Sequence, residues 1–214
     1  MIALNRRRYM GGSKAYDENS YIQDGLVFQL DGINKGNSAD LTTWVDLKGG
    51  RVFTQEGVVE SLADGWKFDG TCHFTCPTLL SGNNNYTVEV CSSKYIAWHN
   101  GTWNNGYPVW YWIGNNLLFI QRTTPVNYSN INRILDNPFT ASLNLDNCYF
   151  NKVLYTGRGS SNLYSDSNSF DIGFYRNAHS TGTMYAIRIY NRRLTSEEQL
   201  KNQDVDIARF NISV

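Results

Sequence analysis

The sequence predicts an all-β domain, a two-sheet antiparallel jelly-roll sandwich with a short C-terminal helix. Its 214 residues include 18 Gly, 14 Tyr, 10 Phe and 6 Trp, a composition that favours strands joined by tight turns. Short segments with alternating apolar residues, such as Gly25 to Asp31, are separated by turn-forming residues. Neither half differs in composition, so we expect one domain over residues 22–214, preceded by a flexible arm of residues 1–21.

Further strand candidates occur throughout the chain, at spacings typical of a sandwich or jelly roll. They are Leu41 to Leu47, Arg51 to Thr54, Trp66 to Phe74, Thr87 to Val90, Val109 to Ile113, Leu117 to Gln121, Phe139 to Leu145, Tyr149 to Tyr155 and Phe170 to Phe174.

The closing segment MYAIRIYNRRLTSEEQLKNQ changes its hydrophobic period. In its first half, Tyr185, Ile187 and Ile189 alternate with the residues between them, which predicts a strand with these three on one buried face. Thr195 and Glu198 then fit a capping box. The sequence therefore predicts a strand followed directly by a short helix that ends near Gln203.

Charge suggests no nucleic-acid partner, because 19 basic and 19 acidic residues cancel. The run Arg6-Arg7-Arg8 is interpreted as part of a solvated arm. No apolar run approaches the roughly 20 residues that a transmembrane helix needs, so no membrane contact is expected. No classical signal peptide is recognised, which predicts a cytoplasmic or virion-associated protein.

The cysteines have two interpretations. Cys72 and Cys76 flank His73 in TCHFTC, which resembles half of a zinc site. Cys91 and Cys148 have no partner at ligand spacing, so the second half is missing. We therefore expect buried free thiols, with a disulfide and a metal site as the alternatives.

Several residues have structural interpretations. Trp44 and Trp66 lie in alternating segments and are predicted to be in the core. Asp46 and Asp69 border turns, where they are expected to accept backbone hydrogen bonds.

Five segments together resemble a known family: GLVFQLDG, TTWVDLKGG, GWKFDGT, FDIGFYR and MYAIRIYNRRLTSEEQ. Their order and spacing are similar to those of the laminin-G-like branch of the concanavalin A-like lectin/glucanase superfamily, over about residues 22–210. The resemblance implies a jelly roll of two curved antiparallel sheets. It also implies that the helix after Leu194 covers an end of the sandwich.

Catalysis is not expected, although the superfamily contains hydrolases, lectins and adhesion modules. Its hydrolases carry an E-x-D-x-x-E strand motif that places the catalytic carboxylates on one sheet face. No such triplet is present: Glu89 stands alone, and Glu197 and Glu198 lie on the predicted helix. No acidic cluster marks a calcium site, so no metal or other cofactor is predicted.

Recognition is predicted for the segment YIAWHNGTWNNGYPVWYWIGNN. Stacking aromatic rings beside amides suit sugars, which present apolar faces and hydroxyl edges. Part of this segment must face the core if it forms a strand, so only the loop Trp98 to Tyr107 is predicted to be exposed. The predicted ligand-binding residues are Trp98, Asn100, Trp103, Asn104, Asn105 and Tyr107.

The sequence thus predicts a non-catalytic recognition module that binds a glycan or a surface protein. The N-terminal RRRYMGG resembles the start of hypothetical proteins from gut-bacterial genomes and their prophages. This likeness gives the alternative of a phage virion or tail component whose arm docks into a larger assembly. A glycoside hydrolase is the less favoured third possibility.

Overall fold

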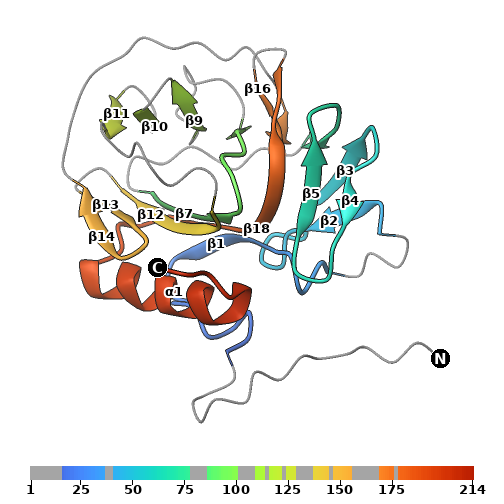
Figure 1. The fold of residues 1–214 in the computed structure, drawn as a ribbon. Helices are drawn as coiled ribbons and strands as arrows, with labels where there is room; N and C mark the ends of the chain where they lie inside the picture. Colours follow the sequence, from blue (N-terminus) through green and yellow to red (C-terminus); the bar gives the residue numbers. More distant parts are fainter. Residues whose placement is uncertain are drawn as a thin grey trace.

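The computed structural model is a β-sandwich with one helix, as the sequence predicts (Figure 1). It describes residues 16–36, 41–77, 86–100, 109–113, 116–121, 124–128, 137–144, 147–155, 169–175 and 178–214. Two eight-stranded antiparallel sheets, here called sheet A and sheet B, pack face to face around one apolar core.

Sheet A is built around the ten-residue strand β18. Its order is β14-β13-β12-β7-β18-β5-β4, with β1 also paired to β18. The strands are β1 (Leu26–Asp31), β4 (Glu60–Ser61), β5 (Trp66–Asp69), β7 (Thr87–Ser92), β12 (Phe139–Leu143), β13 (Cys148–Phe150), β14 (Val153–Tyr155) and β18 (Thr181–Tyr190).

Sheet B has the order β11-β10-β9-β8-β15-β6-β3-β2. Its strands are β2 (Thr43–Val45), β3 (Val52–Glu56), β6 (His73–Cys76), β8 (Trp98–Asn100), β9 (Val109–Ile113), β10 (Asn116–Gln121), β11 (Thr124–Tyr128) and β15 (Phe170–Ile172). A small hairpin of β16 (Phe174–Tyr175) and β17 (Ala178–His179) follows β15.

Two predicted strands are each divided in the structure. The range Trp66 to Phe74 forms β5 in sheet A and β6 in sheet B. Gly70 has φ 93°, so the chain turns there, where a residue with a Cβ is rarely stable. The range Tyr149 to Tyr155 forms the hairpin β13–β14, because Asn151 and Lys152 both have positive φ (45° and 65°), as in the tight turns that join hairpin strands.

The core between the sheets is dominated by aromatic rings. Trp44 and Trp66 have no exposed surface, which confirms the prediction for both. Their ring centroids lie 6.3 Å apart, and each also contacts Phe74. The prediction for Asp46 is also confirmed, because its Oδ1 accepts the backbone N–H of Lys48, in the adjoining turn, at 3.0 Å.

Helix α1 (Ser196–Phe210) starts as predicted and ends later. Thr195 and Glu198 form the predicted capping box, but the helix continues seven residues beyond Gln203. It lies over the outer face of sheet A (Figure 1), so the expectation that it covers an end of the sandwich is wrong. The reason is that the buried side of α1 is mostly polar and forms hydrogen bonds with polar side chains of sheet A.

Both faces of β18 are buried, and a β-bulge changes its predicted pattern. The register with β7 shifts between Met184 and Ala186. As a result Met184 belongs to the core, whereas Tyr185 stacks on Phe210 at 5.4 Å, on the side of α1. The prediction that Tyr185 shares a face with Ile187 is therefore wrong.

All four cysteines are buried and free, as predicted. Cys72, Cys76 and Cys148 belong to the core, and Cys91 lies in the apolar cluster beneath α1. The cysteines beside His73 therefore face the core, and this excludes the half-site for zinc. Burial raises the pKa of Cys91 and Cys148, which keeps both thiols protonated.

Tyr21, the last residue of the predicted arm, contacts helix α1. Tyr21 is only 2% exposed, and its hydroxyl donates to Asp206 Oδ1 at 2.8 Å. Residues 1–15 lie outside the described residues, so the flexible arm and its docking into an assembly stay predictions.

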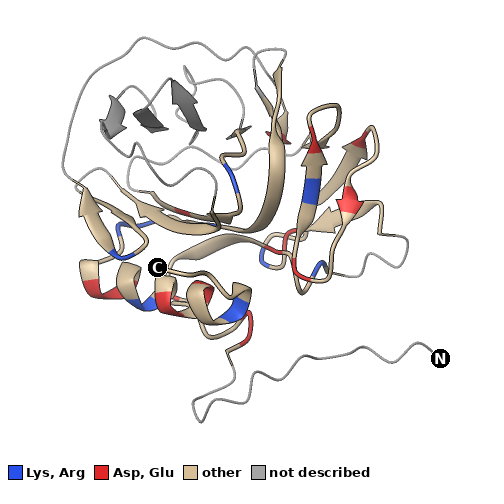
Figure 2. Ribbon diagram, viewed as in Figure 1, with Lys and Arg blue, Asp and Glu red and all other residues tan. Residues whose placement is uncertain are grey.

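Charges of both signs are distributed over α1 and over β4 and β5, which pair with one another (Figure 2). Lys67 Nζ and Glu60 Oε2, for example, form an exposed ion pair at 2.8 Å between β5 and β4. In the part of the chain that the structure describes, no helix is long and apolar enough to cross a membrane.

Candidate ligand-binding face

Trp98 is buried in the core, so its predicted exposure is wrong. It has no exposed surface, and its ring lies 5.7 Å from that of Phe170. The physical reason is that Trp98 is the first residue of β8, not part of a loop, and pairs in register with Ile172 and Trp110. A side chain at this position faces the core with Phe170 and Ile172.

The other predicted binding residues follow Trp98 along the chain. Asn100 ends β8, where its backbone pairs with Phe170 of β15, but its side chain lies outside the described residues. Trp103, Asn104, Asn105 and Tyr107 fall in residues 101–108, also outside the described residues. Their exposure and their role in binding stay predictions. The segment that carries them begins where β8 ends, beside β15.

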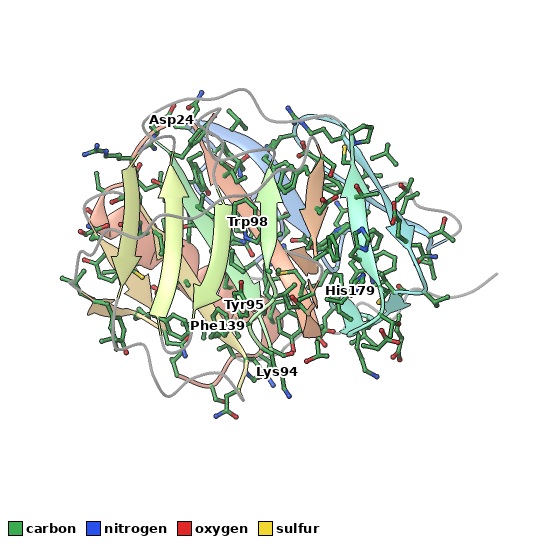
Figure 3. All side chains as sticks on the ribbon, turned by 90° about the horizontal axis from the view of Figure 1, so that it is seen from above. Asp24, Lys94, Tyr95, Trp98, Phe139 and His179 are labelled. Atoms are coloured by element: carbon green, nitrogen blue, oxygen red, sulfur yellow. The ribbon has the colours of Figure 1, made fainter. Side chains whose placement is uncertain are left out.

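The face of sheet B opposite to the core, here called the outer face, carries polar side chains. In β15, Asp171 lies between two core residues, Phe170 and Ile172. In β6, Thr75 lies between the core residues Phe74 and Cys76. Because side chains alternate along a strand, Asp171 and Thr75 share the outer face. Figure 3 views sheet B from this side.

Asp171 is held by two hydroxyl donors. Thr75 Oγ1 donates to its Oδ1 at 2.5 Å, and Ser169 Oγ donates to its Oδ2 at 2.7 Å. The residue is 5% exposed. Its backbone pairs with His99 of β8 on the other side. These two hydrogen bonds fix the orientation of the carboxylate on the outer face of sheet B.

A second cluster lies at the other end of β6. His73 shares the outer face with Thr75, and its ring stacks on Phe174 with centroids 4.8 Å apart. His179 of β17 contacts both rings, at 5.3 Å from His73 and 4.8 Å from Phe174. Glu56 of β3 pairs with His73 in register. Imidazoles, an aromatic ring and carboxylates thus lie together on β3, β6, β15, β16 and β17.

The outer face of sheet B shows no cluster of three or more metal ligands among the described residues. Among the described residues, no group of three or more His, Cys, Asp or Glu could hold a metal ion.

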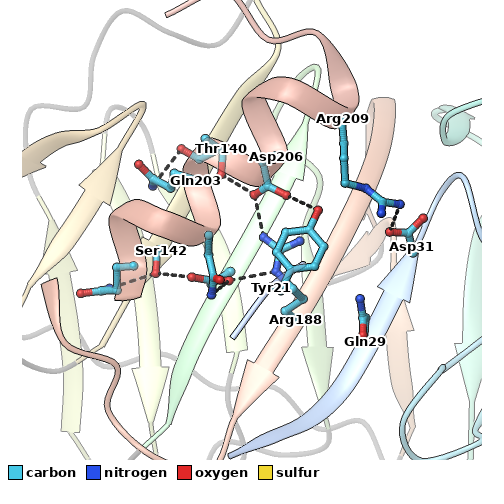
Figure 4. Close-up of polar contacts among 12 residues, drawn as sticks. Tyr21, Gln29, Asp31, Thr140, Ser142, Arg188, Gln203, Asp206 and Arg209 are labelled. Carbon is cyan, nitrogen blue, oxygen red and sulfur yellow. Dashed lines mark hydrogen bonds and ion pairs between the residues drawn. The ribbon is translucent and has the colours of Figure 1, made fainter. Parts of the chain in front are cut away.

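The outer face of sheet A is closed by α1 over a buried network of charged side chains (Figure 4). Arg188 of β18 lies between two carboxylates: its Nε donates to Glu89 Oε2 at 2.9 Å and its Nη2 to Asp206 Oδ2 at 2.6 Å. The ring of Tyr21 lies 3.8 Å from the guanidinium carbon. Thr140 Oγ1 also donates to Asp206 Oδ2, at 2.6 Å.

Amide and hydroxyl groups complete the network around Glu89. Asn202 Nδ2 donates to Glu89 Oε2 at 3.0 Å, and Ser142 Oγ donates to Oε1 at 2.9 Å. Burial raises the pKa of Glu89, and Arg188 acts in the opposite direction. Glu89 is 1% exposed, so it is not the isolated strand carboxylate that the sequence suggests. This network holds the helix and offers no access to a ligand.

The sequence interpretation missed this network because its members are far apart in the chain. Arg188 and Glu89 are 99 residues apart, and Asn202 and Glu89 are 113 apart. Two signals were present. Arg188 occupies a strand position between apolar residues, and α1 carries polar residues where an apolar stripe is typical. The buried residues of the helix are Gln199, Asn202, Gln203, Val205, Asp206 and Phe210.

No family model and no curated protein matches the sequence. Among solved structures, this chain is similar to domain 4 of AbnA, an extracellular GH43 arabinanase from Geobacillus stearothermophilus. That structure is a complex with arabinotriose. The TM-score is 0.58 and the sequence identity is 16%, and the match covers 85% of this chain and 98% of that chain. The fold is a β-sandwich of a kind found in several proteins.

Two further similarities are of the same kind. Trypanosoma rangeli sialidase matches with a TM-score of 0.54 and 19% identity, over 84% of this chain and 33% of that chain. The receptor-binding domain of botulinum neurotoxin type G matches with a TM-score of 0.54 and 13% identity, over 85% and 51%. This chain thus spans about a third of the sialidase and half of the toxin domain. At these identities the similarities show the fold alone, so the laminin-G-like branch stays a prediction.

Proposed function

We propose that this protein is a non-catalytic recognition module that binds a glycan on the outer face of sheet B. The observation that carries the proposal is the contrast between the two outer faces. Helix α1 closes the outer face of sheet A, whereas no helix of the described residues lies on the outer face of sheet B (Figure 1). On that face lie Thr75, which is partly exposed, and Asp171 and His73, which are 5% and 8% exposed. Their polar groups are of the kinds that exchange hydrogen bonds with sugar hydroxyls.

The position of the predicted binding residues in the sequence also supports a site on the outer face of sheet B. The rest of the predicted loop Trp98 to Tyr107, after its first three residues, directly follows β8, and β8 pairs with β15, the strand that carries Asp171. An indole that stacks on the apolar side of a sugar ring would complement these hydrogen-bonding groups. The domain of similar fold from the arabinanase is in complex with arabinotriose, which supports a glycan as the ligand.

The absence of catalysis is part of the proposal, and the surroundings of Glu89 support it. A glycoside hydrolase needs two carboxyl groups that reach the glycosidic bond. Glu89 and Asp206 are close to one another through Arg188, but both are buried under α1. The carboxylate of Asp171, on the outer face of sheet B, accepts hydrogen bonds from Thr75 and Ser169.

A glycan array with purified protein tests the proposal. The wild type is expected to bind at least one glycan, and Trp103→Ala is expected to abolish this binding with the unfolding midpoint almost unchanged. Lys201→Ala, at an exposed position of α1, is the matched control and keeps full binding. If Lys201→Ala lost binding and Trp103→Ala kept it, the ligand would bind near α1, and the proposed site on sheet B would be contradicted.

A reducing-sugar assay tests the non-catalytic part separately. No sugar release from β-glucans or arabinan is expected. Turnover by the wild type would contradict a pure recognition role, even if the array confirmed glycan binding.

A further inference from the structure

Two histidines on the outer face of sheet B have the spacing of ligands on one metal ion. His73 Nδ1 and His179 Nε2 lie 3.3 Å apart. Two nitrogen atoms bound to a tetrahedral zinc ion at about 2.0–2.1 Å from the metal are about 3.3 Å from one another. This distance also fits a hydrogen bond between the rings, so the surroundings of the pair decide what else it can do.

An exposed carboxylate lies near the other ring nitrogen of His73. Nε2 lies 3.6 Å from Glu56 Oε2, which is longer than a hydrogen bond, and the Glu56 side chain is 64% exposed. A carboxylate on the second nitrogen is the usual outer partner of a histidine that ligates a metal, because it fixes the tautomer and increases the basicity of the ligating nitrogen. A small rotation of the Glu56 side chain would bring it into this role, with the proton of His73 on Nε2. An ion bound to both histidines would then lie off the line that joins Nδ1 of His73 and Nε2 of His179.

The position of His179 is also fixed by the fold. It pairs in register with Phe174 in the hairpin β16–β17. Both ends of the hairpin are bonded to Ala97, the residue before β8: Gly173 N donates to the carbonyl of Ala97 at 2.7 Å, and Ala97 N donates to Ser180 Oγ at 3.0 Å. The fold therefore brings the two nitrogen atoms within 3.3 Å of one another.

We propose that His73 and His179 bind a divalent transition-metal ion, of which Zn²⁺ and Ni²⁺ are the test cases. Imidazole nitrogen suits these ions, whereas Ca²⁺ and Mg²⁺ take oxygen ligands. His73 is almost buried, but His179 is only partly buried, so water or an outside ligand completes the coordination. The site uses two protein ligands and does not depend on the proposed glycan binding.

Isothermal titration calorimetry of the EDTA-treated full chain with Zn²⁺ measures the affinity and stoichiometry of this site. The wild type is expected to bind one ion. Both His73→Gln and His179→Gln should weaken this binding by at least about 100-fold, because a single imidazole remains. Glu56→Gln should weaken it by about 10-fold, the lower end of the usual effect of losing an outer-shell partner, because the Glu56 contact is longer than a hydrogen bond. His99→Gln, the variant of the third histidine of the chain, is the matched control with unchanged affinity.

An NMR measurement on the wild type does not depend on whether the variants fold. Zn²⁺ should shift the imidazole nitrogen signals of His73 and His179, at Nδ1 of the first and Nε2 of the second, and leave His99 in place. The absence of saturable binding, or equal affinity in the wild type and both His→Gln variants, would overturn the proposal. The 3.3 Å contact would then be a hydrogen bond only.

Discussion

Arg188 Nη2 and Asp206 Oδ2 form an ion pair at 2.6 Å beneath α1, with side chains only 1% and 0% exposed. The same helix forms a second pair of equal length, Lys152 Nζ to Asp204 Oδ1 at 2.6 Å, whose side chains are 39% and 52% exposed. The two pairs differ in burial, and Asp206 also accepts hydrogen bonds from Tyr21 and Thr140. They therefore allow a comparison of a carboxylate in a buried network with one in an exposed ion pair on the same helix.

Asp206→Ala should greatly destabilise the protein, because Arg188 would keep a buried charge with one carboxylate partner removed. Breaking a buried pair in this way costs about 3–5 kcal/mol. Asp204→Ala, which breaks the exposed pair on the same helix, should cost about 0.2–1 kcal/mol. Urea unfolding of both variants measures the two losses. Equal losses would show that the buried network does not hold α1 to sheet A.

The N-terminal segment should contribute to stability only from about Tyr21 onward. Deleting residues 1–15 should shift the unfolding midpoint by no more than about 1–2 °C, because they carry few apolar residues to bury. Deleting residues 1–21 also removes the hydroxyl that donates to Asp206 and the ring over Arg188. This loss should lower the midpoint by roughly 4 °C or more.

Thermal unfolding of the two truncated chains measures the difference. A large loss from the shorter deletion would mean that residues 1–15 pack against the domain, contrary to the predicted flexible arm. Tyr21→Phe, which removes only the hydroxyl, should lower the free energy of unfolding by about 0.5–1.5 kcal/mol.

Three tryptophans should behave as core residues and one should not. Trp44, Trp66 and Trp98 have no exposed surface, so replacing any of them by Ala should cost about 3–5 kcal/mol. Trp103 lies in the glycine- and asparagine-rich segment NGTWNNG, where an exposed indole is expected, and Trp103→Ala should cost about 0.5 kcal/mol or less. Denaturant midpoints compare the four variants. If Trp103→Ala were as destabilising as Trp98→Ala, the indole would be a core residue.

The ion pair at the start of α1 should make stability depend on acid pH. Arg192 lowers the pKa of Glu198 from 4.5 to about 2, through two hydrogen bonds of 2.9 and 2.7 Å. Because the folded-state pKa is below the unfolded value, the ionised carboxylate stabilises the fold above about pH 4.5. This contribution decreases as the pH falls toward 2.

Glu198→Gln removes the contribution, so the variant should be less stable than the wild type at pH 7. The difference should decrease between pH 4.5 and 2. Chemical unfolding at several pH values measures it. A difference that is constant down to pH 2 would mean that the pKa of Glu198 is not lowered by Arg192.

Much of the fold could be predicted from the sequence because alternation reports which residues face the core. Trp44, Trp66 and the buried thiols follow from this rule, and the start of α1 follows from the Thr195 capping box. The position of α1 did not follow, because the helix packs on sheet A through polar residues such as Asn202 and Asp206. The partners of these residues come from distant strands.

The site was less predictable for a related reason. Trp98 lies beside polar residues in the sequence but starts a strand, and only the pairing of β8 with β15 shows that it faces the core. The pairing of β15 with β6, on the other side of β15, brings Asp171 and Thr75 together, although they are 96 residues apart. A short-range pattern cannot contain a contact of this kind, since it depends on the order of the strands in the sheet.

The central claim is that a glycan binds on the outer face of sheet B, and an NMR titration of ¹⁵N-labelled protein tests it most directly. Arabinotriose is the first probe, followed by the glycan with the strongest array signal. Addition should shift the backbone amide signals of Thr75, Asp171 and the segment after β8, and leave those of α1 unchanged. Shifts confined to α1 and its neighbours, or no shift with any glycan, would contradict the account.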